Sequence, residues 1–386
     1  MKDMNRKALL LSVIVSLTVL VFISACKGES ATQLAELPSS AIVLQDQGGY
    51  AVGGRKVKHE GTFDMAHCYE PEGQTAYGDH AYALYQIPVN ARKYPLVFLH
   101  GGSMTKRCWS STPDGRDGFQ NIFLRKGYSV YLVDQPRNGE SGRTTNVNEA
   151  PIVTNVPNYD DRLRFTLFRL GEWPDFYPGV QFPKDSASLE QFFRLGAMTA
   201  GEDDRDVIAE AMAALLEKIG PAVLVTHSAN GTVGWRTALL SDKVKAIVSY
   251  EPGGGKYGPF IFPKGEVPKA IPTYWGPIEP MAVEPDEFKK LTKMPIIIYY
   301  GDNIATEPVA DAGRDQWRGE LQMARIFAET VNRHGGNCTV IHLPEIGIKG
   351  NTHFPFLDIN NSEIADLMEK FLQEKGLADF PEKNIK

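Results

Sequence analysis

The main part of the sequence lacks basic clusters, internal repeats and low-complexity tracts, and it contains few cysteines. The 386 residues carry a net charge of -6, and without a basic run this balance argues against nucleic acid as a partner. The 4 cysteines have spacings that fit neither a zinc site nor an iron–sulfur cluster.

The N-terminus carries a targeting signal. Basic residues among the first seven precede the apolar run 8–21, which ends in Ile23-Ser24-Ala25-Cys26. This pattern is typical of bacterial lipoproteins, so we expect residues 1–25 to be a signal peptide and Cys26 to carry the lipid. An uncleaved membrane anchor is the alternative, because the apolar run is nearly long enough to span. Either way, the sequence predicts an exported protein held at the periplasmic or extracellular face of the cell envelope, with the membrane as a partner.

The remaining chain is expected to form a tether and one folded domain. Residues 26–45 are small and polar, which indicates a tether. Residues 46–386 are long enough for one large core with an insertion, which we place at about 143–203. Among the cysteines after Cys26, we expect Cys68 to pair with Cys108, since both lie in a loop-rich region and Cys338 opens an apolar strand. Other pairings of these three remain open.

Apolar runs that alternate with helical patterns indicate an α/β domain. A strand, a helix and another strand in this order predict a mostly parallel sheet with helices on both faces. The expected strands are 81–87, 94–99, 128–133, 222–225, 244–250, 295–300 and 338–343, and the expected helices include 204–219 and 316–334.

The stretch Val223–Gly231 stops an apolar run abruptly at a serine and then begins a helical pattern. It predicts a strand, a sharp turn and a helix, with the hydroxyl of Ser228 exposed at the tip like the nucleophile of a serine hydrolase. Such a turn usually has glycine two residues before and two after the serine. This chain has Thr226 and Asn230 there, with glycine one place later. A serine that only caps the helix is the alternative.

A second turn, His100-Gly101-Gly102, directly follows a buried strand. Two glycines there let the backbone pass close to a ligand. We expect Gly102 or Ser103 to supply one N–H of an oxyanion hole, and Ala229, beside the serine, to supply the other. A simple tight turn is the alternative.

Together these motifs resemble the bacterial alpha/beta-hydrolase esterases related to esterase 713. The resemblance covers about residues 80–375 and implies an alpha/beta-hydrolase fold and the activity of a serine esterase, without naming a substrate. It is carried by His100-Gly101-Gly102, Thr112-Pro113-Asp114-Gly115-Arg116-Asp117-Gly118, Gly127-Tyr128, Asp134-Gln135-Pro136, Thr226-His227-Ser228, Tyr250-Glu251-Pro252 and Gly347-Ile348-Lys349-Gly350-Asn351-Thr352-His353.

Two acidic residues end strands at positions that keep the order serine, acid, histidine of this fold. Glu251 follows the strand 244–250, and Asp302 follows the strand 295–300. The resemblance favours Glu251 as the triad acid, with Asp302 as the alternative. His353, on a glycine-bearing loop after the last strand, is the expected general base. A third strand-end acid, Asp134, is expected to order its own loop.

The insertion at about 143–203 breaks the α/β pattern with a stretch rich in aromatic residues. We expect a cap whose aromatics line an apolar acyl or alcohol pocket, with simple packing onto the core as the alternative. These aromatics are Phe165, Phe168, Trp173, Phe176, Tyr177, Phe182, Phe192 and Phe193.

The expected chemistry is hydrolysis of a small-molecule carboxylic ester through an acyl-enzyme intermediate. Ser228 attacks while His353 takes its proton and Glu251 holds the histidine, so no metal or organic cofactor is required. Hydrolysis of a lactone, thioester or amide is one alternative, and a non-catalytic ligand-binding lipoprotein is another. Haloalkane dehalogenases and epoxide hydrolases are disfavoured, because they use aspartate where this chain has Ser228. The sequence predicts no particular oligomeric state.

Overall fold

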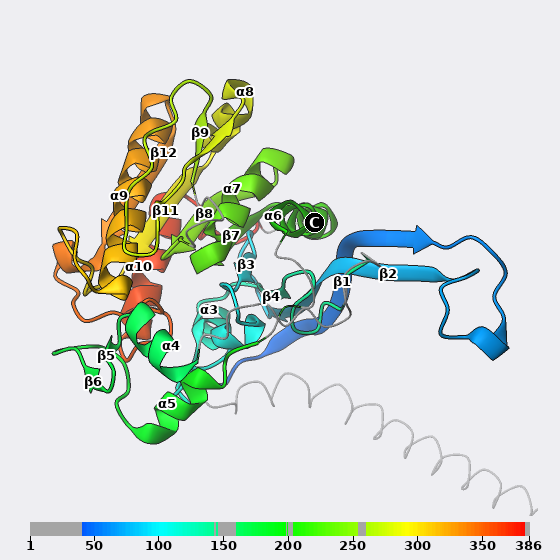
Figure 1. Cartoon of the computed structure of the whole chain (residues 1–386), viewed down its shortest axis with the longest axis horizontal. Helices are drawn as coiled ribbons and strands as arrows, with labels where there is room; N and C mark the ends of the chain where they lie inside the picture. The colour runs from blue at the N-terminus through cyan, green and yellow to red at the C-terminus, as the bar shows by residue number, and fades with distance from the viewer. Residues whose placement is uncertain are drawn as a thin grey trace, which may run out of the picture. The chain divides into compact units, whose positions relative to one another are not determined.

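One large sheet forms the centre of the domain. The structure, a computed structural model, describes residues 41–142, 144–145, 160–197, 199, 204–253 and 260–382. Within these ranges the main sheet has eight strands in the order β1-β2-β4-β3-β7-β8-β11-β12 (Figure 1). From β4 to β12 every neighbouring pair is parallel, whereas β1 and β2 are antiparallel additions at one edge. The strands are β1 (Leu44–Lys58), β2 (Thr75–Pro88), β3 (Leu96–Leu99), β4 (Val130–Asp134), β7 (Ala222–His227), β8 (Val244–Tyr250), β11 (Pro295–Tyr300) and β12 (Asn337–His342).

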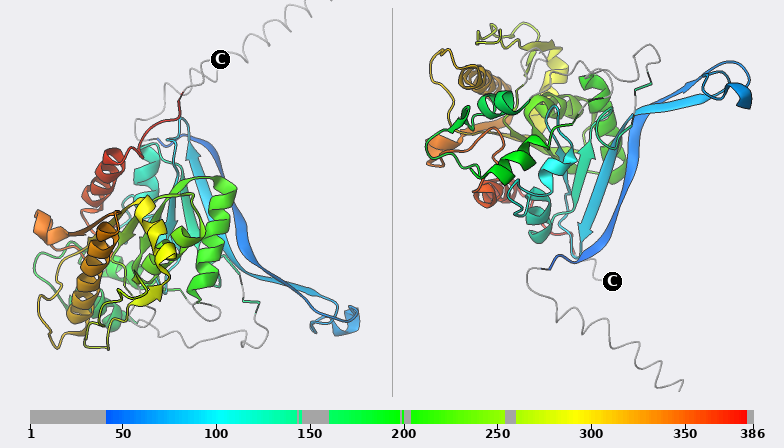
Figure 2. Two further views of the ribbon diagram at one scale, coloured as in Figure 1. Left: turned by 90° about the horizontal axis from the view of Figure 1, so that it is seen from above. Right: turned by 60° about the horizontal axis from the view of Figure 1, so that its bottom comes forward.

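Helices lie on both faces of this sheet, which confirms the predicted fold class (Figure 2). α6 packs beside α7, and α3 packs beside α10. Asp204 caps α6, because its carboxylate accepts the N–H groups of Asp206 and Val207. The helices are α3 (Phe119–Arg125), α4 (Asp161–Leu167), α5 (Ser186–Phe193), α6 (Arg205–Ile219), α7 (Gly231–Leu240), α8 (Pro285–Phe288), α9 (Ala312–Arg333) and α10 (Asn361–Glu374).

Short elements connect the main ones. Two small sheets pair β5 (Gly171–Glu172) with β6 (Asp175–Phe176) and β9 (Ile261–Pro263) with β10 (Met281–Val283). Single 3-10 turns are η1 (Met65–His67), η2 (Lys106–Trp109), η3 (Ser228–Asn230), η5 (Lys289–Lys293) and η6 (Leu343–Ile346). α4, β5, β6 and α5 lie within the predicted insertion at about 143–203.

The central strands β3, β4 and β7 are buried over their whole length, as their apolar runs predict. Strands of a parallel sheet with helices on both faces have no solvent side, so they carry continuous apolar runs instead of alternation. The carboxyl ends of these strands meet at one edge of the sheet, where the predicted site residues follow them.

The long hairpin of β1 and β2 was not expected from the sequence, which predicted its first strand only at residue 81. Its far end, with η1, extends away from the rest of the domain (Figures 1 and 2). Most of β1 is exposed, and it contains Gly48, Gly49, Gly53 and Gly54. Because few of its residues face a core, β1 shows no apolar alternation that could predict a strand.

The predicted disulfide between Cys68 and Cys108 is wrong, because all three cysteines after Cys26 are free. Cys68 follows η1 at the far end of the hairpin, whereas Cys108 is buried in η2 beside the central strands (Figure 1). The two thiols therefore belong to separate parts of the domain, although the sequence places them 40 residues apart. Burial raises the pKa of the Cys108 thiol well above its usual range.

The predicted leader, Cys26 and most of the tether lie outside the described residues. In the part of the chain that the structure describes, no helix is both long and apolar enough to span a membrane.

Candidate active site

Ser228 lies at a sharp turn between a strand and a helix. β7 ends at His227, Ser228 opens η3, and α7 begins at Gly231. Ser228 has a φ of 53°, in the left-handed region that a residue with a side chain rarely adopts. A strained residue at such a junction is the geometry of a nucleophile elbow. The Ser228 side chain is half-buried, and its hydroxyl makes no hydrogen bond to another described residue.

The alternative that Ser228 caps a helix does not fit this geometry. His227 is the N-cap of η3 and Asn230 is the N-cap of α7, and neither uses its side chain as a cap. Asn230, one of the two departures from the usual glycine spacing, instead joins the loops after β3 and β4 to the start of α6. Its amide donates to the carbonyl of His100 and to Gln135 Oε1, and its oxygen accepts from Arg205. Asn230 therefore fixes the elbow against its neighbours.

Glycines are needed where the turns of the site approach one another. A side chain at Gly231 would overlap Pro252, which explains why glycine stands one place later than usual. A Cβ at Gly101 would lie 2.6 Å from His227 Nδ1 and 2.8 Å from Ser228 Cβ. Real Cβ atoms do not approach this closely, so only glycine lets the turn after β3 reach the elbow.

The three predicted oxyanion residues lie in these two turns. A Cβ at Gly102 would be 3.5 Å from Ala229 Cβ, so the turns face each other. Ser103 has a φ of 55°, and its carbonyl accepts the N–H of Ala197 at 2.9 Å. Neither Gly102 nor Ser103 donates its amide N–H to another described residue. Free backbone donors beside a nucleophile can stabilise an oxyanion.

The structure brings Glu251, and not Asp302, to His353. Glu251 Oε2 accepts the Nδ1–H of His353 at 3.1 Å, and both side chains are completely buried. The carboxylate of Asp302 accepts backbone N–H groups from Asn303 at 2.6 Å and from Gly350 at 2.7 Å. Asp302 therefore orders the loop that carries His353 rather than contacting the imidazole.

His353 is held on all sides but keeps one free nitrogen. Its ring stacks on Phe168 at 4.8 Å and lies 4.0 Å from the ring of Trp317. Its Nε2 is buried without a hydrogen-bond partner, and no hydrogen bond joins it to Ser228 in the described chain. Burial lowers the pKa of His353 well below the usual 6.5, and the charge of Arg169 lowers it further. His353 is therefore neutral at physiological pH, with Nε2 available as a base.

Two further groups that the sequence did not single out hold the histidine loop. His227 Nε2 donates to the carbonyl of His353 at 3.0 Å, and the two rings are 4.6 Å apart. The carboxylate of Asp358 accepts the N–H and the hydroxyl of Thr352, each at 2.8 Å. Burial raises the pKa of Asp358 to about 7.

Arg169 is the third group that the sequence did not single out. It comes from the insertion, directly after α4, and donates from Nη2 to Glu251 Oε1 at 2.6 Å. Its surroundings in sequence, Phe168-Arg169-Leu170-Gly171, contain no motif that points to this role.

Asp134 has the structural role predicted for it. Its carboxylate accepts the backbone N–H and the ammonium of Lys106 at 2.8 and 2.7 Å, and the N–H of Glu140 at 2.9 Å. Burial alone would raise the pKa of Asp134, but His100 and these donors outweigh it and lower the pKa. Asp134 thus orders the loops after β3 and β4.

The described aromatics of the insertion pack mainly on one another and on the core. Phe165 lies 4.9 Å from Phe176, and Phe192 lies 5.2 Å from Phe182 and 5.3 Å from Phe354. Phe168 differs from them, because it stacks on the ring of His353. Packing therefore accounts for most of these side chains.

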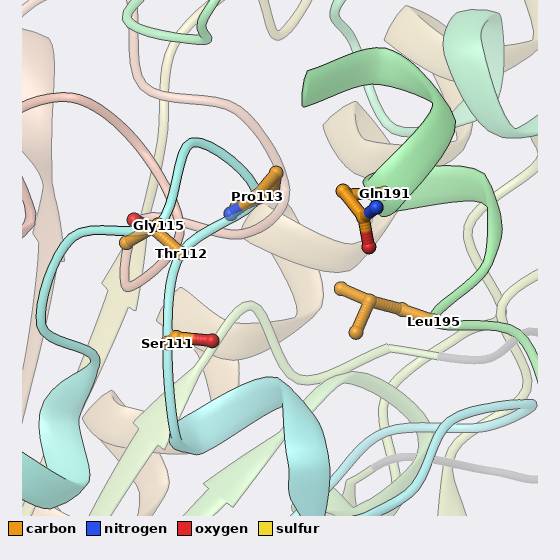
Figure 3. A pocket seen from close by; sticks show the side chains of 6 residues that line it. All are labelled: Ser111, Thr112, Pro113, Gly115, Gln191 and Leu195. Carbon is orange, nitrogen blue, oxygen red and sulfur yellow. The ribbon is translucent and has the colours of Figure 1, made fainter. Parts of the chain in front are cut away.

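A pocket lies between α5 and the loop that follows η2 (Figure 3). Its volume is about 200 Å³, and the hydroxyl of Ser111 and the amide of Gln191 point toward Leu195 inside it. Two residues after Leu195, Ala197 binds the carbonyl of Ser103 in the glycine turn. Ala197 thus links the segment after α5 to the glycine turn, but the pocket itself is lined by no residue of that turn or of the elbow. Its lining residues are Ser111, Thr112, Pro113, Gly115, Gln191 and Leu195.

Comparison with known proteins places these features in context. Residues 96–328 match the family model described as the alpha/beta hydrolase family. The chain is 30% identical over 317 residues to the probable secreted lipase phiG of Fungal sp. (strain ATCC 74256), covering 75% of this chain and 84% of that protein. A solved structure described as a novel bacterial esterase has 29% identity and a TM-score of 0.69, covering 88% of this chain and 99% of the other.

Proposed function

Because the chain belongs to the alpha/beta hydrolase family, we propose that it is a serine esterase with Ser228 as nucleophile, His353 as general base and Glu251 as triad acid. The family and its lipase and esterase relatives support ester hydrolysis in general. The observation that carries the finer proposal is the buried Glu251–His353 hydrogen bond, which leaves His353 Nε2 without a partner. We further propose a specific relation to the esterases related to esterase 713.

In the proposed reaction, His353 Nε2 takes the proton of the Ser228 hydroxyl as the serine oxygen attacks the ester carbonyl. Glu251 holds the Nδ1–H of the ring, so Nε2 is the nitrogen that accepts, and the carboxylate stabilises the imidazolium that forms. Ala229 and either Gly102 or Ser103 donate their N–H groups to the oxyanion, each donor typically contributing about 3 kcal/mol. His353 then returns the proton to the leaving alcohol.

The second half of the reaction repeats these roles with water. His353 Nε2 accepts a proton from a water molecule while the water oxygen attacks the acyl carbonyl. The proton then passes from His353 to the oxygen of Ser228 as the acid leaves. No step of this scheme uses a metal or an organic cofactor. The proposed substrate is a small ester, with the insertion at about 143–203 forming a cap.

The test is covalent labelling of the leader-free protein with a fluorophosphonate, followed by mass spectrometry and by turnover of p-nitrophenyl acetate and butyrate. We expect the label on Ser228 and no label or turnover in Ser228→Ala, while Asp302→Asn, which keeps the triad, still reacts. A folded wild-type protein that neither reacts nor turns over would contradict the proposal and favour a ligand-binding lipoprotein. If the protein is labelled and turns over a lactone, thioester or amide but no ester, the nucleophile stands and the bond that the enzyme cleaves is a different one.

We also propose that the protein is exported and held at the membrane by a lipid on Cys26. The match to a secreted lipase is consistent with export. The leader pattern before Cys26 supports the lipid anchor, since small residues before a cysteine are the cleavage signal of lipoproteins.

A further inference from the structure

Arg169 joins the insertion to the acid of the proposed triad. Its Nη2 donates to Glu251 Oε1 at 2.6 Å, and its Nε donates to the carbonyl of Asp302 at 2.8 Å. The side chains of Arg169 and Glu251 are both 0% exposed. The N–H of Gly301 also donates to Glu251 Oε1. His353 donates to the other oxygen, Oε2, so both oxygens of the carboxylate accept hydrogen bonds that fix its position.

The segment that contains Arg169 also contacts the proposed base directly. The carbonyl of Leu167 accepts the indole N–H of Trp317 at 2.8 Å, and Trp317 lies against the ring of His353. The carbonyl of Phe168 accepts the N–H of His353 at 3.1 Å. The guanidinium of Arg169 lies 5.3 Å from the centre of the Trp317 ring. Three consecutive residues of the insertion therefore contact the acid–base pair or its neighbours.

We propose that Arg169 is a positioning residue that holds the Glu251 carboxylate for His353, so that the triad is assembled only when the segment 167–169 of the insertion is docked. This inference rests on the proposed serine-esterase function. It extends that function, because it assigns part of the catalytic geometry to a side chain outside the α/β core.

The backbone strain and the unsatisfied donor at Arg169 point to this role rather than to a contribution to stability alone. Arg169 has a φ of 61°, which disfavours a residue with a side chain. Its Nη1 is buried and has no hydrogen-bond partner. A buried charged pair with an unsatisfied donor contributes little net stability, and an apolar pair of similar volume is often as stable. Strained and incompletely satisfied groups concentrate at functional sites.

The charge of Arg169 also affects the base. A cation near an imidazole disfavours the imidazolium, and this effect adds to burial in lowering the pKa of His353. Arg169 thus keeps His353 neutral as the pH falls. The other ionisable side chains around the pair include His227 at the end of β7, Tyr300 at the end of β11, Glu320 in α9 and Asp358 in the histidine loop.

The test compares Arg169→Met and Arg169→Lys with a matched control, Arg137→Met. Arg137 also has a positive φ, of 66°, and pairs with a buried carboxylate, Asp79, at 2.7 Å, but it does not contact Glu251 or His353. For each variant, kcat and KM for p-nitrophenyl butyrate are measured from about pH 5 to pH 9, together with the melting temperature. The titration of His353 is followed by NMR of isotope-labelled histidine.

For Arg169→Met we expect kcat to fall about 100-fold with KM changed less than about threefold, because the group acts on the base and not on the substrate. The acid limb of kcat/KM and the His353 titration should both move up by about one pH unit, since a nearby cation is lost. Arg169→Lys keeps the charge, so its acid limb should stay at the wild-type pH. Its kcat should be about tenfold higher than that of Arg169→Met. Arg137→Met should lower only the melting temperature.

Several outcomes would overturn the inference. One is an Arg169→Met protein that loses activity only in proportion to its folded fraction, with the acid limb and the His353 titration unmoved. Another is an equal shift of the acid limb in Arg137→Met. If instead the wild-type protein neither labels with a fluorophosphonate nor turns over esters, the proposed function itself fails. If the wild-type protein is labelled but the substitutions of Arg169 change neither kcat nor the acid limb, only the inference about Arg169 fails.

Discussion

Glu251→Gln is the substitution that separates the two candidate acids most sharply. The carboxylate of Glu251 accepts from Arg169 and Gly301 on one oxygen and from His353 on the other. Glutamine has the same shape but only one oxygen, so its NH2 group must replace one of these acceptors. If its oxygen keeps Arg169 and Gly301, its NH2 group faces His353 Nδ1 and favours the tautomer that carries the proton on Nε2. That tautomer cannot take the proton of Ser228.

The expected loss in kcat is about 10⁴-fold, or about 5 kcal/mol, which is the size of effect that a wrong tautomer has in a serine triad. Glu251→Gln also leaves the cation of Arg169 buried without its counter-ion, and breaking such a pair costs about 3–5 kcal/mol of stability. Unfolding in urea must therefore accompany the kinetics, so that activity is compared per folded molecule.

Asp302→Asn is the matched comparison. Asp302 accepts two backbone N–H groups, from Asn303 and Gly350, and asparagine can keep only one of them. The loss of one hydrogen bond should cost about 1–3 kcal/mol of stability and less than about tenfold in kcat. Turnover of p-nitrophenyl acetate, corrected for folded fraction, measures both variants. If Asp302→Asn costs more activity than Glu251→Gln, the assignment of the triad acid to Glu251 is wrong.

The site and the leader lead to four further predictions. Gly101→Ala should lower kcat at least about 100-fold, because the new methyl group would overlap the His227 ring and Ser228 at the elbow. Gly115→Ala, which has open space but a φ of 84°, should cost about 1–3 kcal/mol in unfolding experiments through backbone strain alone. Because the pKa of His353 is lowered by burial and then by Arg169, kcat/KM should stay constant as the pH falls through 6.5, and a midpoint of the acid limb at or above 6.5 would contradict this. Since the unfolded state binds this proton more readily, the same shift should make the protein less stable as the pH falls below 6.5. Cys26→Ala should abolish incorporation of labelled palmitate in bacteria, and equal labelling of the variant would refute lipidation at this residue.

Much of the fold could be predicted from the sequence, because its signals are local. The expected strands 244–250 and 295–300 coincide with β8 and β11, and the expected helix 204–219 coincides with α6 and its cap. Continuous apolar runs, a capping aspartate and turn glycines each act within a few residues, so they can be read without the tertiary structure. The hairpin of β1 and β2 gave no such signal, since β1 is mostly exposed and rich in glycine.

The missing disulfide and the long hairpin share one cause. The sequence placed Cys68 and Cys108 in one loop-rich region, but β2 carries the chain from the far end of the hairpin back to the sheet between them. Sequence distance is a poor guide to spatial distance wherever an element of this length intervenes.

The sequence by itself determined the elbow at Ser228, the glycine turn after β3 and the late histidine, because each is defined by the residue types next to it. Only the tertiary structure decided which acid contacts His353, since Glu251 and Asp302 end neighbouring strands and differ only in where their side chains reach. It alone revealed Arg169, which lies 82 residues from Glu251 in the chain. Contacts between a core strand and an inserted segment depend on how the whole chain packs, and no local pattern of residues encodes them.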